Sequence, residues 1–81
     1  MTPETKTLVM QVLKEKHEHD TYAIKGALFS LSLDQEQVER GRSQGARTRA
    51  MNNVAAQQRH IESLKADLAK LDAAIAELEA T

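Results

Sequence analysis

The residues of this sequence that could do chemistry are a short run of histidines and carboxylates, and a group of arginines. His17, Glu18, His19 and Asp20 are consecutive, and the third histidine is His60. On a helix His17 and His19 point to different sides, and His17 shares a face only with Asp20. A zinc site needs three or four converging ligands, and the absence of cysteine excludes thiolate sites and disulfides. We therefore expect no metal and no cofactor, and interpret His17 as a partly buried core residue.

Catalysis is not expected either. The sequence shows no nucleophile beside a base and no phosphate-binding glycine pattern, so we assign no catalytic residues and predict that the protein is not an enzyme. One Tyr and one Phe are too few for a platform on which nucleic-acid bases stack. No apolar run is long enough to span a membrane, and the N-terminus lacks a signal-peptide pattern, which favours a cytoplasmic protein.

The arginines are the one strong charge signal. Residues 40–59 carry all five arginines and no acidic residue, whereas acidic residues outnumber lysines both before and after this segment. The planar guanidinium suits phosphate and carboxylate, so the cluster predicts binding of an anionic partner such as nucleic acid, a nucleotide or another phosphate-bearing ligand, or an acidic protein surface. The alternative is a solvated loop that neutralises Glu36 and Glu39. The candidate anion-binding residues are Arg40, Arg42, Arg47, Arg49 and Arg59.

Helix-breaking residues divide the chain once. Thr2 and Pro3 are typical of a helix start, and the only clustered turn signal is the segment from Gly41 to Gly45. The 81 residues thus form one domain, with a helix over about 3–40, a loop at 41–45 and a helix over about 46–80. Ser43 or Thr48 could cap the second helix. A break of the first helix near 19–21 or 32–34 stays open, because both places carry capping residues.

Heptad repeats predict how the two helices pack. In the second helix the repeat is Val54, Ile61, Leu68 and Ile75, with Gln57, Leu64, Leu71 and Leu78. In the first helix the weaker repeat is Met10, His17, Ile24, Leu31 and Val38, with Leu13, Asp20, Ala27 and Asp34. The short loop makes the helices antiparallel neighbours, so we predict an all-α, coiled-coil-like helical hairpin. The preferred register places His17 opposite Leu71 and Asp20 opposite Leu68.

The first helix carries more apolar surface than one partner helix can cover. A second stripe consists of Leu8, Val12, Tyr22, Gly26, Phe29 and Leu33, where the glycine permits close approach. The simplest way to cover this stripe is a homodimer, in which two hairpins make a four-helix bundle. The alternative is that a different protein docks on it.

These observations predict a small interaction protein that binds another macromolecule as an adaptor, inhibitor or assembly factor of the bacterial or phage accessory type. One alternative is a nucleic-acid or nucleotide binder that acts through the arginines. Another is a purely structural coiled coil.

Overall fold

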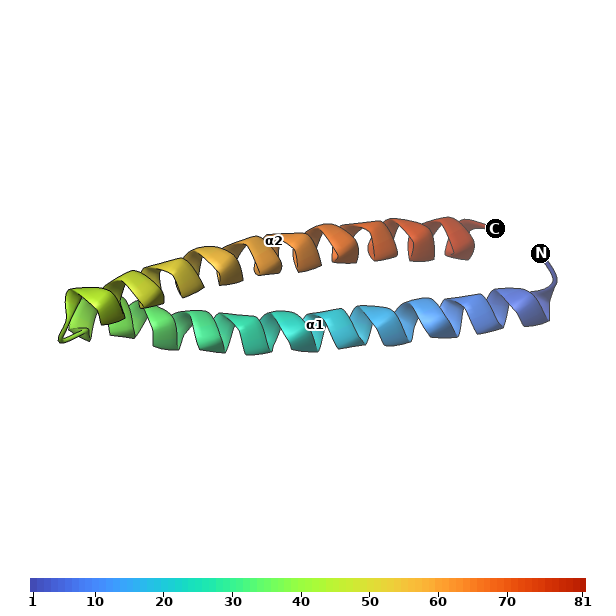
Figure 1. Cartoon of the computed structure of the whole chain (residues 1–81). Coiled ribbons are helices and arrows are strands. Elements are labelled where there is room, and N and C mark those ends of the chain that lie inside the picture. The colour runs from blue at the N-terminus through green and yellow to red at the C-terminus, as the bar shows by residue number, and fades with distance from the viewer.

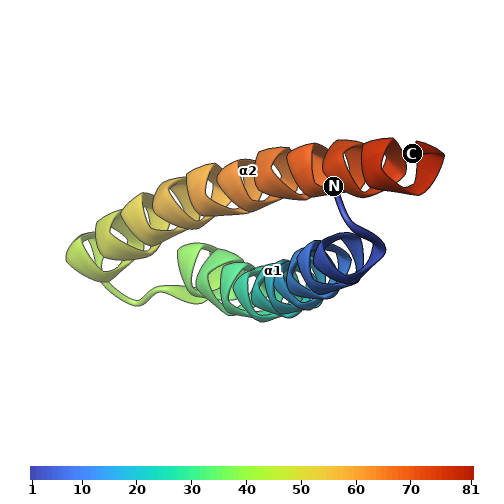
Figure 2. The ribbon, with the colours of Figure 1, turned by 90° about the vertical axis from the view of Figure 1, so that its right-hand side faces the viewer.

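The computed structural model describes all 81 residues as two antiparallel helices, which confirms the predicted all-α hairpin. Helix α1 spans Pro3–Arg40 and helix α2 spans Gln44–Ala80. They lie side by side along their whole length and form a rod whose Cα atoms extend over 61 × 14 × 13 Å (Figures 1 and 2). Neither helix has an apolar stretch of the length and hydropathy needed to cross a bilayer.

Both helices begin at a side-chain cap. The Thr5 N–H donates to Thr2 Oγ1 at 3.2 Å, and the Ala46 N–H donates to Ser43 Oγ at 3.1 Å. Ser43 is therefore the cap of α2, and Thr48 instead donates its hydroxyl to the Gln44 carbonyl within the helix. Because Ser43 can satisfy the first free N–H groups, α2 starts at Gln44 and the connection is shorter than the predicted 41–45.

The connection is tight at Gly41. A Cβ atom there would lie 2.6 Å from Arg47 Cγ and 2.8 Å from the Gln37 carbonyl oxygen. Only glycine therefore fits this position without a shift of the neighbouring backbone.

Helix α1 is continuous, so neither break considered at 19–21 or 32–34 forms. The residues that could have capped a new helix near 19–21 have other partners in the structure. Thr21 Oγ1 donates to the His17 carbonyl at 2.8 Å, and the Asp20 carboxylate accepts from Lys16 Nζ at 2.8 Å. With no proline after Pro3, nothing removes a backbone hydrogen bond from the helix.

The core is a single seam between the helices, made by the two heptad repeats. All predicted seam positions are buried or half-buried, and the most enclosed apolar residues are Ala50 and Ile61, each 5% exposed. His17 Nε2 lies 2.8 Å from Asp72 Oδ1, next to its predicted neighbour Leu71, so the register agrees with the prediction at this layer. Each helix buries one stripe and leaves the rest of its surface in solvent.

Ile61 gives a direct test of the seam. We expect Ile61→Ala to lower the free energy of unfolding by about 2 to 4 kcal/mol, because a cavity replaces packed methyl groups in a narrow core. Met51→Ala is the matched control, since Met51 is 58% exposed, and it should change stability by less than about 0.5 kcal/mol. Urea unfolding followed by circular dichroism measures both. Equal losses for the two variants would contradict a seam centred on Ile61.

Candidate interaction surfaces

The first candidate surface is the apolar stripe of α1, which the structure leaves exposed. Tyr22 is 73% exposed and Phe29 68% exposed. The other large apolar members of the stripe, Leu8, Val12 and Leu33, are exposed as well. Gly26 also lies on this stripe, and a Cβ atom there would meet nothing within 4 Å. No part of the hairpin covers the stripe.

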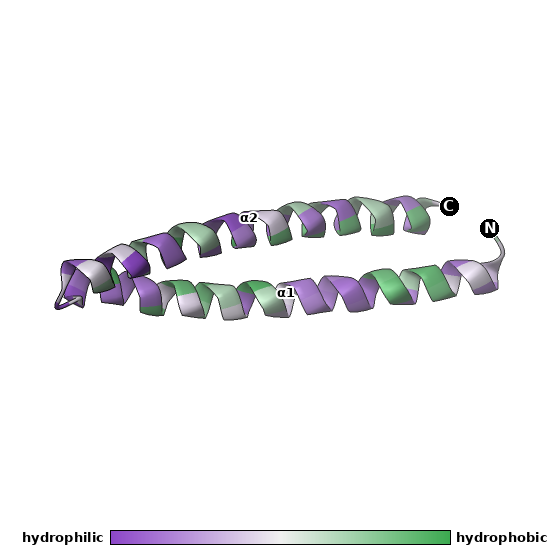
Figure 3. Ribbon diagram, viewed as in Figure 1, coloured by the Kyte–Doolittle hydropathy of each residue, from purple (hydrophilic) through white to green (hydrophobic).

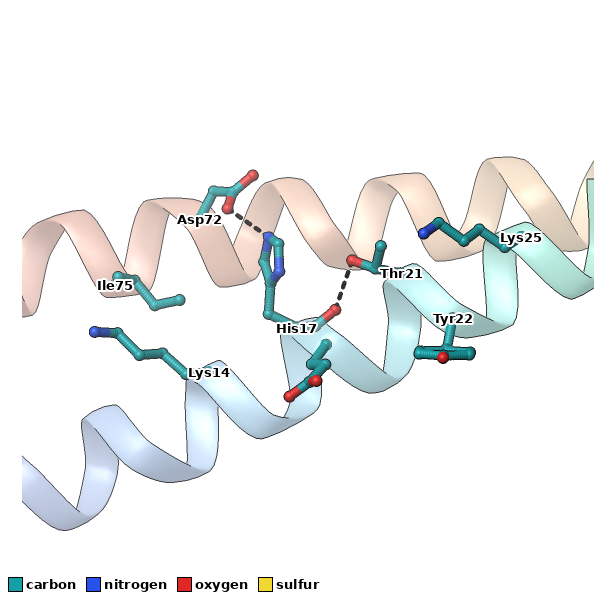
Figure 4. A pocket seen from close by; sticks show the side chains of 8 residues that line it. Lys14, His17, Thr21, Tyr22, Lys25, Asp72 and Ile75 are labelled. Carbon is teal, nitrogen blue, oxygen red and sulfur yellow. Dashed lines mark hydrogen bonds and ion pairs between the residues drawn. The ribbon is translucent and has the colours of Figure 1, made fainter.

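The stripe lies on the side of α1 that faces away from α2. At about 100° per residue, its mean direction is rotated by roughly 150° from the mean direction of the seam residues. The close-up view agrees, because Tyr22 projects from α1 on the side opposite α2 (Figure 4). We call this surface the outer face; it consists of Leu8, Val12, Glu15, His19, Tyr22, Gly26, Phe29 and Leu33.

Polar residues divide the outer face into two apolar parts. Glu15 and His19 occupy the same helical repeat as the apolar members, between Val12 and Tyr22. Coloured by hydropathy, α1 shows a hydrophilic stretch between two apolar ones (Figure 3). The ammonium group of Lys25 lies 6.0 Å from the centre of the Tyr22 ring, so a cation sits beside the apolar centre. The apolar repeat in the sequence predicts the apolar residues of the outer face. It does not predict the polar members Glu15 and His19 or the neighbouring Lys25.

The second candidate surface is the arginine cluster at the closed end of the hairpin. Arg40 ends α1 and pairs with Glu36 at 2.8 Å, and Arg47 Nε donates to the Gly41 carbonyl at 3.1 Å. Arg42 in the connection and Arg49 in the second turn of α2 are exposed and make no ion pair. The structure thus gathers four of the five arginines at this end.

Arg59 does not belong to this cluster. It lies 15 residues beyond the start of α2, which is about 22 Å along the helix axis. A ligand held at the closed end of the hairpin would have to be long to reach Arg59 as well.

A shallow hollow of about 630 Å³ lies between the helices near the middle of the rod. Its lining includes Lys14, His17 and Lys25 from α1 and Asp72 and Ile75 from α2 (Figure 4). The His17–Asp72 contact crosses the hollow and ties the helices together. No three histidine, aspartate or glutamate side chains converge here or elsewhere in the chain.

Asp20 is the most enclosed residue of the protein, with 0% of its surface exposed. Its Oδ1 accepts from Lys16 Nζ at 2.8 Å and lies 3.4 Å from His19 Nδ1, whereas Oδ2 has no partner. The hydrogen bond from Lys16 lowers the pKa of Asp20 below its ordinary 3.8, against the opposing effect of burial, and His19 adds to the lowering. The same hydrogen bond raises the pKa of Lys16 above 10.5.

A second polar contact links the helices closer to the arginine cluster. Gln57 Nε2 donates to Asp34 Oδ2 at 2.6 Å, while Gln57 Oε1 is buried without a partner. Both residues occupy seam positions, so this contact belongs to the packing of the hairpin.

Comparisons with protein-family models, with curated proteins and with solved structures gave no match.

The ion pair of Asp20 predicts a pH dependence of stability. A carboxyl group whose pKa is lowered by folding stabilises the fold above its ordinary pKa, and this contribution disappears as the pH falls through the lowered value. We expect the stability of the wild type to converge toward that of Asp20→Asn as the pH drops below 3.8. Thermal unfolding from pH 6 down to pH 2 measures this. Glu62→Gln, an exposed carboxyl without an ion pair, is the control. Parallel curves for wild type and Asp20→Asn would contradict the assignment.

Proposed function

We propose that this chain is a non-enzymatic interaction protein whose outer face of α1 binds another protein chain. The observation that carries the proposal is the second apolar repeat of α1, which is exposed on the side opposite the seam. A helix with two apolar stripes on opposite sides is suited to lie between two other helices, of which α2 supplies only one. The helical spacing of its apolar residues is that of helix-to-helix recognition.

The partner class follows from the shape of the outer face. The face is a narrow stripe along one helix, and the hollow beside Leu8 and Val12 is shallow, so an apolar stripe of another helix fits the face better than a small molecule. A second copy of the chain forming a homodimer is the first candidate. A different protein, for which this chain would act as adaptor, inhibitor or assembly factor of the bacterial or phage accessory type, is the second. We place this binding in the cytoplasm.

The two aromatic residues should dominate the binding energy, because aromatic anchors commonly do so at protein interfaces. We expect the double variant Tyr22→Ser, Phe29→Ser to weaken association by about 100-fold or more, since two anchors lose their apolar area together. Sedimentation equilibrium measures self-association, and capture from host-cell lysate measures binding to other proteins.

The helical content of this variant should stay unchanged by circular dichroism, because both side chains point into solvent in the hairpin. Met51→Ser, an exposed apolar residue of α2, is the matched control and should retain binding. If the double variant associates and captures proteins as the wild type does, the outer face is not the binding surface.

A second candidate function is binding of nucleic acid or a phosphate-bearing ligand by the arginine cluster. The observation in its favour is that Arg42 and Arg49 are exposed without a carboxylate partner, although acidic residues abound elsewhere. Only the end of the rod could make such contacts, because acidic residues outnumber basic ones along both arms.

This candidate predicts salt-dependent binding to labelled single- or double-stranded DNA or RNA. We expect Arg42→Ala, Arg49→Ala to abolish binding at physiological salt and to reduce the salt dependence by about two phosphate contacts. Lys65→Ala, Lys70→Ala, which removes the same charge from α2, should bind as the wild type does. Absence of binding by the wild type at low salt would refute this function. If the outer-face test failed too, a purely structural coiled coil would remain.

A further inference from the structure

We propose that the partner of the outer face is a second copy of this chain, with the two α1 helices antiparallel and Leu8 of each copy facing Leu33 of the other. This inference rests on the proposed function and names the partner and its register. The partner and register follow from the order of side chains along the outer face. When the same face of a second copy runs in the opposite direction, suitable side chains lie opposite one another.

The pairing follows from one choice of register. When Leu8 faces Leu33 of the second copy, Val12 faces Phe29 at the next layer inward. The apolar residues at both ends of the outer face therefore meet apolar residues of the second copy. The two-fold axis crosses the helix pair at the level between Asp20 and Thr21.

The polar members of the outer face also find suitable neighbours in this register. Glu15 faces Gly26 of the second copy, whose missing side chain leaves room for the glutamate to reach solvent. His19 faces Tyr22, so the ring of each aromatic residue packs beside an imidazole. No carboxylate is forced against an apolar residue.

Other registers are worse. Moving one helix by a heptad in one direction places Glu15 against Leu33, and moving it in the other direction places Phe29 against Thr5. A parallel pair in register would stack Glu15 on its own copy. Burial of a charge against an apolar side chain or beside a like charge is unfavourable, which disfavours the first shift and the parallel pair. The other shift takes the apolar partner from Phe29 and carries Leu33 past the start of α1 at Pro3.

Charges at the edge of the outer face select the same register. In an antiparallel helix pair, residues that flank the stripe on one side meet their counterparts across the interface. Here Glu18 of each copy meets Lys25 of the other, which makes two identical ion pairs beside the two-fold axis. The heptad shifts would instead oppose Glu18 to Glu18 or Lys25 to Lys25. Both residues are exposed, and neither forms an ion pair within the hairpin.

The dimer would be a flat layer of four helices in the order α2, α1, α1, α2. The seam and the outer face lie on nearly opposite sides of α1, so α2 does not lie in the path of a second copy. This differs from the closed four-helix bundle that the sequence suggested, because such a bundle would need both apolar stripes on adjacent sides of each helix.

Charge reversal tests the register. At low salt we expect Glu18→Lys or Lys25→Glu alone to weaken self-association about tenfold or more, because each change turns two attractive pairs into repulsive ones. An equimolar mixture of the two single variants should recover association, and so should the double variant Glu18→Lys, Lys25→Glu, since both restore opposite charges across the interface. Sedimentation equilibrium of each sample measures this.

Glu62→Lys and Lys70→Glu, which make the same charge changes on exposed positions of α2, are the controls and should leave self-association unchanged. The register is refuted if the single variants associate as the wild type does, or if mixing them restores nothing. If the wild type is monomeric at high concentration, the second copy is refuted. In that case, loss of a captured protein in Tyr22→Ser, Phe29→Ser would leave the proposed function standing, and no loss would refute both.

Discussion

A helix can cover only one stripe of its neighbour, and this limit governs the whole molecule. With two helices, the chain encloses a single line of side chains, and only Asp20, Ala50 and Ile61 are buried. Stability must therefore come from many half-buried contacts that repeat along the seam. Such a repeat requires long uninterrupted helices, whose first N–H groups are capped by Thr2 and Ser43. The same limit leaves the second apolar repeat of α1 without cover, and the proposed function arises from that surplus.

Polar groups in the seam trade stability for a fixed register. The contacts of His17 with Asp72 and of Gln57 with Asp34 join the two helices, and a slide by one turn would break both. A buried oxygen atom without a hydrogen-bond partner lowers the stability of the fold, and Gln57 Oε1 is such an atom beside the contact with Asp34. An unbroken apolar seam would hold more tightly but would define its alignment less well.

The sequence was sufficient to predict the hairpin and its seam, because a heptad repeat reports directly which side of a helix is covered. It was insufficient where several local partners compete. Ser43 was one of two possible caps, and the break left open near residues 19–21 does not form because Thr21 and the Asp20 carboxylate bond within one helix instead. Likewise, all five arginines lie within residues 40–59 of the sequence. Only the structure shows that Arg59 lies far from the others and that Arg40 already has a carboxylate partner.

The short connection between the helices has a consequence for how the protein folds. Contacts beside Gly41 join residues close in the sequence, whereas contacts at the open end join residues separated by nearly the whole chain. Loop closure costs least entropy at the connection, so pairing should begin there and travel outward in the manner of a zipper. Fluctuations then open the rod from its termini first, and amide hydrogens near Thr2 and Ala80 exchange with solvent sooner than those around Ile61.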